Sequence, residues 1–501
     1  MQFVSWLNEI IWAPLVYFTL GVGLFFSIAT RFLQARHIKS MVKLMFEGKT
    51  SDDKDSKAGI TPFQALSLSL SSRIGVGNIA GVATAIAYGG PGSLFWMWMM
   101  AFLGGATAFI ESTLAQIYKT KENGQLRGGI PYYIEKGLSI KWLSVLVAIV
   151  ALICYAILFP GIQSNSISSG LHSALGINTS VTGIILVALL GFIIFGGVQR
   201  ISNFAQAIVP FMALGYILVA VYILIINITE VPNMLALVFS SAFGTNSIFG
   251  GIIGSAIAWG VRRALFSNVA GVGEGTYSSA AADVSHPAKQ GLVQAFSIYI
   301  DTLFICTATG FMILLTGMYN VTPVNKEPIV HNIGNVEPGP IYTQSAVDTV
   351  LPGFGSIFVA IAIFFFAFTT LMAFYYIAET NLSYITRSIR NVWLEYILKF
   401  ILLTVTYYGS VQTAEFVWVI GDIGYGSLAW LNIITLLILA KTALKTLKDY
   451  EIQKKNGINP IFDPIKLGIK GATYWEKEFD SKRFIYKETY EKKVKTKDLQ
   501  Q

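Results

Sequence analysis

An apolar segment in the first half of the chain is interrupted by the glycine-rich stretch Ser72-Arg73-Ile74-Gly75-Val76-Gly77-Asn78-Ile79. The second half contains a matching interruption, Phe266-Ser267-Asn268-Val269-Ala270-Gly271-Val272-Gly273-Glu274-Gly275. Inside a bilayer an unpaired backbone N–H or C=O is costly, so a spanning helix breaks only where protein or a cavity satisfies those groups. A pair of such breaks, one in each half, is typical of the binding site of a secondary transporter.

The composition is that of a membrane protein. The chain has 501 residues, of which 54% are hydrophobic and 13% charged, and its mean hydropathy is +0.59. Soluble proteins carry roughly 25% charged residues, so we predict a polytopic membrane protein. Cys154 and Cys306 both lie in apolar runs and are predicted as small core residues without a disulfide. The first basic residue, Arg31, follows the first apolar run, so we expect no cleaved signal peptide.

A membrane-spanning helix needs about 20 mostly apolar residues. Eleven spans are predicted, at 10–30, 62–89, 92–118, 142–173, 178–197, 200–228, 247–283, 287–318, 355–384, 392–409 and 427–446. The segment 230–246 is too short to span, and we expect it to lie at the membrane interface or to re-enter the membrane.

Basic residues lie almost entirely on one side of this topology. Alternate loops and the C-terminal tail hold nearly all of the loop lysines and arginines, whereas the opposite side holds only Lys326. Because basic loops remain cytoplasmic, we predict an external N-terminus and a cytoplasmic C-terminus in the plasma (inner) membrane. The net charge of +8 therefore reflects a lipid bilayer as partner, and no nucleic acid.

Both breaks fall at equivalent places, in the second and the seventh spans. Spans two to six and spans seven to eleven then form two sets of opposite orientation. We predict an all-α polytopic membrane protein with a 5+5 inverted repeat whose spans two and seven are discontinuous. The predicted units are an N-terminal extra helix and cytoplasmic loop (1–61), a first repeat (62–228), a second repeat (229–446) and a basic cytoplasmic tail (447–501). We expect a monomer.

The tail mixes lysines with acidic and aromatic residues. Its aromatic residues include Trp475, Phe479, Phe484 and Tyr486. We expect the tail to pack on the protein or to lie along the anionic inner leaflet. A partner-binding role is the alternative.

The chemistry of the breaks suits a zwitterion. Gly75 and Gly77 allow backbone angles that other residues avoid, and they leave room for a ligand. Exposed helix N-termini attract a carboxylate, and exposed carbonyls attract Na⁺ or an ammonium group. The alternative for each glycine stretch is close packing of helices, for which small residues are common in membranes.

Three further polar residues are candidates. Thr369 and Thr370 in span nine offer two oxygen ligands to a Na⁺ held by backbone carbonyls of span two; the alternative is that each hydroxyl bonds back to its own helix. Gln163 in span four offers an amide to a substrate, and an interhelical hydrogen bond is its alternative.

Ionisable residues inside spans are costly, and by default they are functional. Those that we single out in the predicted spans are Arg73, Glu111, Arg262, Arg263, Glu274, Asp301 and Glu379. We expect Arg73 or Arg263 to pair with Glu111, Glu274 or Asp301, either as structural clamps or in gating and proton coupling. The four histidines are scattered and predict no metal cluster, and the chain has no catalytic motif, so we expect no enzyme.

Longer motifs resemble one family. They are Gly75-Val76-Gly77-Asn78-Ile79-Ala80-Gly81-Val82-Ala83-Thr84-Ala85-Ile86, Gly89-Gly90-Pro91-Gly92, Phe95-Trp96-Met97-Trp98, Ala264-Leu265-Phe266-Ser267-Asn268 with Ala270-Gly271, and His286-Pro287-Ala288-Lys289-Gln290-Gly291. Together they resemble the alanine or glycine:cation symporter family over nearly the whole chain except the tail. The resemblance implies a LeuT-type fold and Na⁺-driven uptake of alanine, glycine or a related amino acid such as glutamine. Na⁺ is then the coupling ion, and no other cofactor is implied.

The resemblance also implies a set of site residues. The substrate carboxylate and side chain would contact Gly75, Val76, Gly77 and Asn78, with Gln163 facing the substrate. The amine would be held, and the pocket capped, by Phe266, Ser267, Asn268, Ala270 and Gly271. The Na⁺ ligands would be the carbonyls of Ser71 and Ile74 with the hydroxyls of Thr369 and Thr370.

Two positions depart from the family pattern. The family often has Thr at the position of Val76 and usually has Glu at the position of Val269, whereas this chain has a carboxylate at Glu274 instead. Alternatives to a Na⁺:amino acid symporter are a carrier of the same fold for another solute, one driven by H⁺ through Glu274 or Asp301, and a non-transporting membrane sensor. A membrane enzyme is disfavoured, because no nucleophile–base or metal constellation is present.

Overall fold

The computed structural model of the chain describes residues 2–49, 59–122, 124–323, 327–387, 389 and 392–478. Lys326, Phe479, Phe484 and Tyr486, which entered the sequence-based predictions, lie outside these described residues. Within the described residues the regular structure is helical apart from two short antiparallel strand pairs.

The first half of the chain forms α1 (Gln2–Ala29), α2 (Leu33–Arg36), α3 (Ile38–Met45), α4 (Pro62–Arg73), η1 (Gly77–Gly81), α5 (Val82–Gly89), α6 (Ser93–Ile117), β1 (Thr120–Glu122), β2 (Gln125–Arg127), α7 (Ile130–Tyr133), η2 (Ile134–Leu138), α8 (Lys141–Ile153), η3 (Cys154–Leu158), α9 (Pro160–Leu175), α10 (Thr179–Ile194), α11 (Gly197–Ile226), η4 (Ile228–Glu230) and α12 (Val231–Ala242). The second half forms η5 (Gly250–Ile252), α13 (Ile253–Asn268), α14 (Glu274–Ala281), α15 (Pro287–Ile298), η6 (Tyr299–Cys306), α16 (Thr307–Thr316), β3 (Asn320–Val321), β4 (Val330–His331), α17 (Pro340–Asp348), α18 (Gly355–Thr386), α19 (Val392–Val411), α20 (Ala414–Lys455) and η7 (Tyr474–Glu478). Of these, η1, η2, η3, η6 and η7 are π-helical, and η4 and η5 are 3₁₀ turns.

Among the described residues, seven helices are long and apolar enough to cross a bilayer. They are Phe3–Ala29, Ser93–Ile117, Lys141–Leu175, Asn203–Ile226, Pro287–Thr316, Gly355–Thr386 and Ala414–Lys455. The apolar helix α10 is shorter, and α19 carries Glu395 and Lys399, which lower its hydropathy. The predicted spans 62–89 and 247–283 are each divided into helical pieces.

The two divisions occur at the glycine-rich stretches. In the first, α4 ends at Arg73, Ile74 leaves the helical conformation (φ −74°, ψ 88°), and helix resumes at Gly77. In the second, Val269, Gly271 and Gly273 have positive φ values of 49°, 89° and 97°. Glycine adopts this region freely, whereas a β-branched residue there costs roughly 1–2 kcal/mol, so packing must hold Val269, which is fully buried.

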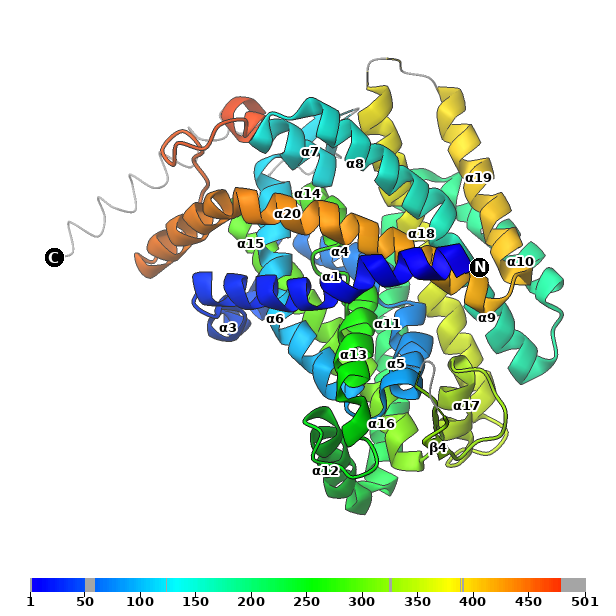
Figure 1. The fold of residues 1–501 in the computed structure, drawn as a ribbon. Helices are drawn as coiled ribbons and strands as arrows, with labels where there is room; N and C mark the ends of the chain where they lie inside the picture. Colours follow the sequence, from blue (N-terminus) through cyan, green and yellow to red (C-terminus); the bar gives the residue numbers. More distant parts are fainter. Residues whose placement is uncertain are drawn as a thin grey trace.

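The helices pack as two groups around the first break. In one group, α6 packs against α13, α14 and α15, and in the other α18 and α19 pack against α9. The half-helix α4 contacts α14 of the first group and α18 of the second. Figure 1 shows α1 and α20 side by side across the face in view, with α12 and α17 at the lower end and α7 near the opposite end. We call these ends the α12 end and the hairpin end, because α7 follows the β1–β2 hairpin.

The segment 230–246, predicted as too short to span, contains a helix of 12 residues, α12, that packs on α6 and α13. Two predicted boundaries were wrong. The helix predicted to begin at 247 begins at Ile253. The last span, predicted at 427–446, begins 13 residues earlier in a helix of 42 residues, α20. Its first turns hold Asp422 and glycines such as Gly421, which lower hydropathy without preventing a helix.

Candidate functional site

The first break exposes backbone N–H groups that two polar side chains satisfy. The N–H of Gly75 donates to Oδ1 of Asn78 over 2.9 Å, and the N–H of Val76 donates to Oε1 of Gln163 over 3.2 Å. All four residues are buried, and Gly77 lies between them. The structure therefore brings Gln163 of α9 to the unwound stretch through an interhelical hydrogen bond, which was the alternative to a substrate contact.

A carboxylate anchors the other side of Asn78. The Nδ2 of Asn78 donates to Oδ1 of Asp301 over 2.7 Å, and the hydroxyl of Ser267 donates to Oδ2 over 2.9 Å. Thr302 donates to the same Oδ2 over 2.7 Å. Asp301 lies in the π-helical turn η6, and such turns are frequent at functional sites. It was recognised from the sequence as an ionisable residue within a span, but its place beside Asn78 and Ser267 was missed.

Aromatic side chains cover Gly77. A Cβ atom on Gly77 would lie 3.0 Å from the Cα of Ser267 and 3.1 Å from the ring of Phe266. The Phe266 ring packs on Trp418 and Tyr425 of α20, with centroid distances of 4.9 and 4.6 Å. Trp418 and Tyr425 were missed, because the sequence-based prediction began this helix after them.

A cavity opens from this cover toward the α12 end. Its volume is about 250 Å³. Its walls include Ala80, Asn165, Ser166, Gln344 and Trp418. The cavity therefore reaches Ala80, in the same π-helical turn as Gly77, so the first break is approached from this end.

Thr370 meets the end of α4. Its hydroxyl donates to the carbonyl of Ser71 over 3.0 Å and to that of Phe366 over 2.9 Å. A Cβ on Gly75 would lie only 2.6 Å from Oγ1 of Thr370. Thr369 donates only to Phe366 of its own helix, over 3.0 Å. Thus Ser71 and Thr370 converge on the break together with the buried Ile74, whereas the hydroxyl of Thr369 points to its own helix.

The second break turns partly away from this pocket. The N–H of Gly271 donates to Oε2 of Glu111 over 3.1 Å, and its carbonyl accepts from Asn432 over 2.9 Å. The N–H of Ala270 donates to Oδ1 of Asn268 over 3.1 Å. Gly271 is thus tied to α6 and α20, and Ala270 packs against Gly104 of α6. The structure does not bring Ala270 and Gly271 to Gln163.

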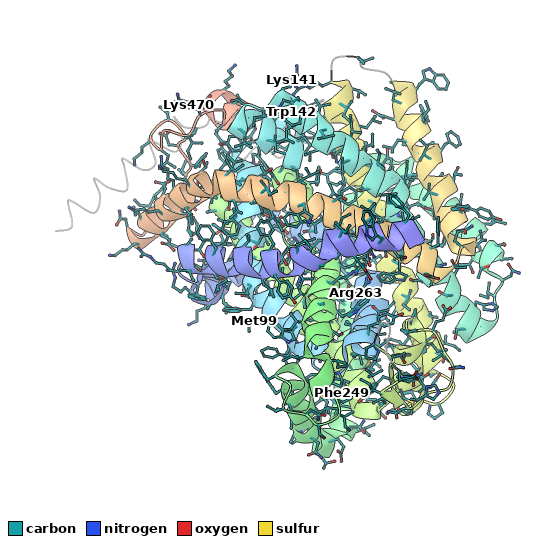
Figure 2. The ribbon with its side chains drawn as sticks, viewed as in Figure 1. Met99, Lys141, Trp142, Phe249, Arg263 and Lys470 are labelled. Carbon is teal, nitrogen blue, oxygen red and sulfur yellow. The ribbon has the colours of Figure 1, made fainter. Side chains whose placement is uncertain are left out.

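The arginines pair differently from the expectation. Nη2 of Arg263 lies 2.9 Å from Oδ2 of Asp422, and Nη2 of Arg262 lies 2.6 Å from the same atom. Figure 2 labels Arg263 on α13, in the middle of the molecule. Arg73 forms no ion pair within 4 Å among the described residues; its guanidinium donates to the carbonyl of Asn268 and to Ser69, Gln294 and Ser297. The predicted pairing of Arg73 or Arg263 with Glu111, Glu274 or Asp301 is therefore wrong at hydrogen-bonding distance.

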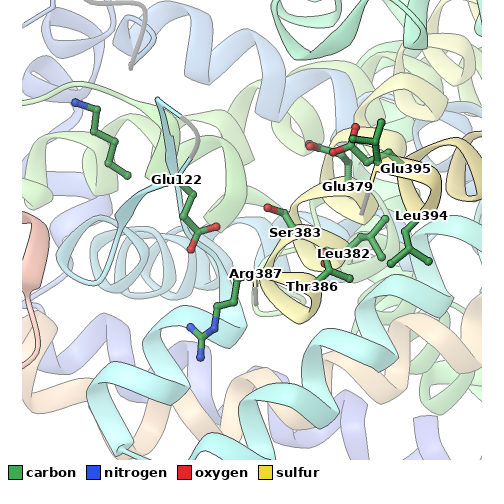
Figure 3. Close-up of a pocket in the computed structure, with 10 residues that line it drawn as sticks. Glu122, Glu379, Leu382, Ser383, Thr386, Arg387, Leu394 and Glu395 are labelled. Carbon is green, nitrogen blue, oxygen red and sulfur yellow. The ribbon is translucent and has the colours of Figure 1, made fainter. Parts of the chain in front are cut away.

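A second, polar cavity lies at the hairpin end. It has a volume of about 430 Å³, and Figure 3 shows Glu122 of the hairpin facing Glu379 and Ser383 of α18 and Arg387, which follows this helix. Arg127 of β2 forms a buried ion pair with Glu379 over 2.8 Å, on the side of this cavity that faces the protein interior. The hairpin and α18 are thus held together between this cavity and the buried interior.

Comparisons with known proteins agree with one another. The model of the family described as "Sodium:alanine symporter family" matches residues 1–464. The chain is 60% identical over 479 residues to a putative sodium/proton-dependent alanine carrier protein of Bacillus subtilis, covering 95% of this chain and 98% of the relative. It is 52% identical over 439 residues to a sodium/proton-dependent alanine carrier protein of Bacillus sp. PS3, covering 87% and 97%. A probable sodium/glutamine symporter of Bacillus subtilis is 40% identical over 456 residues, covering 91% of each chain.

Proposed function

Because this chain belongs to the sodium:alanine symporter family, we propose that it uses an inward Na⁺ gradient to import a small neutral amino acid by alternating access. The chain is a membrane carrier and not an enzyme. Alanine is the first candidate substrate, since the relatives at 60% and 52% identity are named alanine carriers. Glycine and glutamine follow, the latter because of the glutamine symporter at 40% identity.

The unwound stretch from Gly75 to Asn78 carries the proposal. Two backbone N–H groups there, those of Gly75 and Val76, are held by the amide oxygens of Asn78 and Gln163. A substrate carboxylate would take the place of these side-chain oxygens. Phe266 and Ser267 limit the space beside Gly77, so the substrate side chain must be small.

The amino group of the substrate has a negative counterpart close by. Asp301 holds Asn78 and Ser267 in position through hydrogen bonds of 2.7 and 2.9 Å. Its charge favours an ammonium group at the same end of the pocket. Asn268 helps to position this part of the pocket, because its Nδ2 donates a hydrogen bond over 3.2 Å to Thr302, which itself donates to Asp301.

We place the Na⁺ site between α4 and α18. The carbonyls of Ser71 and Ile74 and the hydroxyls of Thr369 and Thr370 supply hard oxygen ligands, which Na⁺ prefers. The hydrogen bond from Thr370 to Ser71 supports the pairing of these two residues. Thr369 has to rotate its hydroxyl away from Phe366 to complete the set.

The proposed topology has eleven spans, with repeats at 62–228 and 229–446 related by inversion. In this topology the N-terminus lies outside the cell, and the hairpin end and the C-terminus lie in the cytoplasm. The carrier is a monomer in the plasma membrane. The cavity beside Trp418 is then the external approach to the pocket.

The test is uptake of radiolabelled alanine, glycine and glutamine into proteoliposomes containing the full chain, with and without an inward Na⁺ gradient at fixed pH. Accumulation of one of them that needs Na⁺ supports the proposal. Binding without accumulation would favour a sensor, and accumulation that is indifferent to Na⁺ would overturn the coupling ion.

A further inference from the structure

A cavity of about 380 Å³ lies between the end of α1 and the last turns of α20. Four basic side chains line it: Arg31 and Arg36, from the segment that follows α1, and Lys448 and Lys455 of α20. Among the described residues, the acidic member of its lining is Glu451. Figure 1 shows both helix ends at the left of the molecule, near α3. We call this space the basic cavity.

Glu451 does not neutralise the cavity, because it is already paired. Its Oε1 lies 2.9 Å from Nη2 of Arg36 and 2.9 Å from Nε2 of His37. The other three basic side chains of the cavity are exposed, and none of them forms an ion pair or a side-chain hydrogen bond with the described part of the chain. The basic cavity therefore carries three positive charges that these residues leave unpaired. A cleft lined by charges of one sign attracts a ligand of the opposite sign.

The backbone turns sharply to place Arg31 at the cavity. Arg31 and Phe32 have positive φ values of 56° and 53°, a region that costs residues other than glycine roughly 1–2 kcal/mol each. Arg36 holds this turn: its Nε donates to the carbonyl of Arg31 over 2.7 Å, and its Nη2 donates to that of Thr30 over 3.0 Å. Backbone strain that the surroundings hold in place is frequent at functional sites. The arginine that pairs with Glu451 thus also fixes the position of an unpaired arginine.

The outward face of α20 shows how the bilayer meets this cavity. Exposed residues recur every three or four positions and so share one face of the helix: Ile434, Ile438, Lys441, Lys445, Lys448, Ile452 and Lys455. The face is apolar up to Ile438 and mainly basic from Lys441 onward. On α1, Ile28 is exposed one turn before Arg31. Outward apolar side chains of both helices therefore give way to basic ones at the cavity, as expected where hydrocarbon meets lipid headgroups.

We propose that the basic cavity binds the phosphate headgroup of an anionic phospholipid of the cytoplasmic leaflet, whose acyl chains lie along the outward apolar faces of α1 and α20. This inference rests on the proposed topology, which puts both helix ends on the cytoplasmic side, and it does not depend on transport. Basic pockets between transmembrane helices on that side bind such headgroups. The guanidinium of Arg31 can donate two parallel hydrogen bonds to one phosphate. The bound lipid would join α1 to α20 beside the Arg36–Glu451 pair.

The experiment measures binding of short-chain phosphatidylglycerol to the purified full chain in an uncharged detergent, by native mass spectrometry and by the midpoint of thermal unfolding. In the wild type we expect one tightly bound lipid and a midpoint that rises with its concentration, whereas phosphatidylcholine of the same chain length should do neither. Arg31→Gln/Lys448→Gln should lower the apparent affinity at least about tenfold. Lys39→Gln/Lys43→Gln, which removes two exposed lysines of α3 outside the cavity, is the matched control and should bind as the wild type does.

Lys448→Gln/Lys455→Gln gives the same test from α20 alone if Arg31→Gln/Lys448→Gln fails to fold, and its affinity should also fall about tenfold. Unchanged affinity in the folded cavity variants, or equal binding of phosphatidylcholine, overturns the proposal. Glycerol phosphate that raises the midpoint as much as the lipid would assign the cavity to a free phosphate and overturn the lipid. Since binding is measured without a Na⁺ gradient, a negative result here leaves the proposed uptake standing, and a failure of uptake leaves this result standing.

Discussion

Arg263 of α13 and Asp422 of α20 form a buried ion pair, with Nη2 2.9 Å from Oδ2. Both side chains are nearly inaccessible, and the Arg263 guanidinium also lies 4.6 Å from the centre of the Trp418 ring. Trp418 in turn packs on Phe266. The pair therefore ties the half-helix that covers Gly77 to the last long helix, directly beside the proposed external approach.

Replacing Asp422 by Asn should destabilise the carrier. The variant leaves Arg263 and the half-buried Arg262 without their shared carboxylate, and breaking a buried pair by removing one partner costs about 3–5 kcal/mol. We expect a clearly lower midpoint of thermal unfolding in detergent. Asp463→Asn, which removes a carboxyl near the C-terminus, is the control. An unaltered midpoint in Asp422→Asn would mean that the pair carries no net stability.

Thr370→Val should weaken Na⁺ coupling more than Thr369→Val does. Thr370 already contacts the Ser71 carbonyl, whereas Thr369 contacts only its own helix. We expect the Na⁺ concentration for half-maximal alanine uptake to rise about tenfold in Thr370→Val, equivalent to about 1.4 kcal/mol. Thr380→Val, which removes a hydroxyl bonded to Tyr376 in the same helix, should leave it unchanged. An unchanged Na⁺ dependence in Thr370→Val would contradict the ion site.

Gly77→Leu should abolish substrate binding. Even a methyl group there would approach Ser267 to 3.0 Å and the Phe266 ring to 3.1 Å, so we expect Gly77→Ala to weaken alanine binding and Gly77→Leu to eliminate it. The matched control is Gly81→Ala, where the nearest atom would be 3.9 Å away. Equilibrium binding of labelled alanine to purified protein measures all three. Binding retained in Gly77→Leu would place the substrate elsewhere.

Local sequence signals predicted the two breaks in the helices. Gly75 and Gly77 alone indicate either an interruption or a close contact between helices, and the matching stretch in the second half favours the interruption. Gln163 follows a Pro-Gly step within a span, and the structure brings it to Val76. Each of these signals lies within a few neighbouring residues, so one sequence suffices to detect it.

Features that depend on contacts between residues far apart in the sequence could not be predicted from these local patterns. Asp422 lowers the hydropathy of its own segment, and only its pairing with Arg263, 159 residues away, explains how it is accommodated within a helix. The orientation of Thr370 toward Ser71, and of Gly271 toward Glu111, is decided by how α18 and α6 pack. Adjacent threonines in one helix give no local indication of which one faces a neighbouring helix.

The stability of the hairpin end should decrease in mild acid because of His286. This residue caps α15: its Nδ1 accepts from the N–H of Ala288 over 3.1 Å, and its Nε2 lies 3.3 Å from a carboxylate oxygen of Asp449. In this arrangement Nε2 carries the proton. Burial lowers the pKa of His286 below its usual 6.5 although Asp449 opposes the shift. The unfolded chain therefore takes up a proton first, and the contribution of His286 to stability is lost as the pH falls below about 6.5.

His286→Asn tests this assignment. Asparagine keeps an oxygen that can accept from Ala288 as a helix cap, but it does not titrate. We expect the unfolding midpoint of the wild type to drop more between pH 7 and pH 5.5 than that of His286→Asn, with the two curves closest at pH 8. Parallel curves would exclude His286 as the titrating group.

Residues 459–478, which we call the C-terminal strap, bind several elements at the hairpin end. Phe462 and Trp475 are fully buried; the N–H of Phe462 donates to the carbonyl of Ser285 over 3.0 Å. The indole N–H of Trp475 donates to the carbonyl of Gln116 at the end of α6 over 2.8 Å. Lys136, ahead of α8, donates to Thr473 over 3.0 Å. The strap thus joins α6 and the start of α15 to the segment that leads into the second helix group.

In the proposed transport cycle the two helix groups separate at the hairpin end, so the strap should slow this step. Trp475→Ala removes the largest buried side chain of the strap, at a cost of about 3–5 kcal/mol. We expect the maximal rate of alanine uptake to rise while the half-saturating alanine concentration stays constant, because the substrate pocket is untouched. Lys477→Ala, at an exposed position of the strap, should match the wild type. A lower unfolding midpoint without a faster rate would mean that the strap only stabilises this end of the protein.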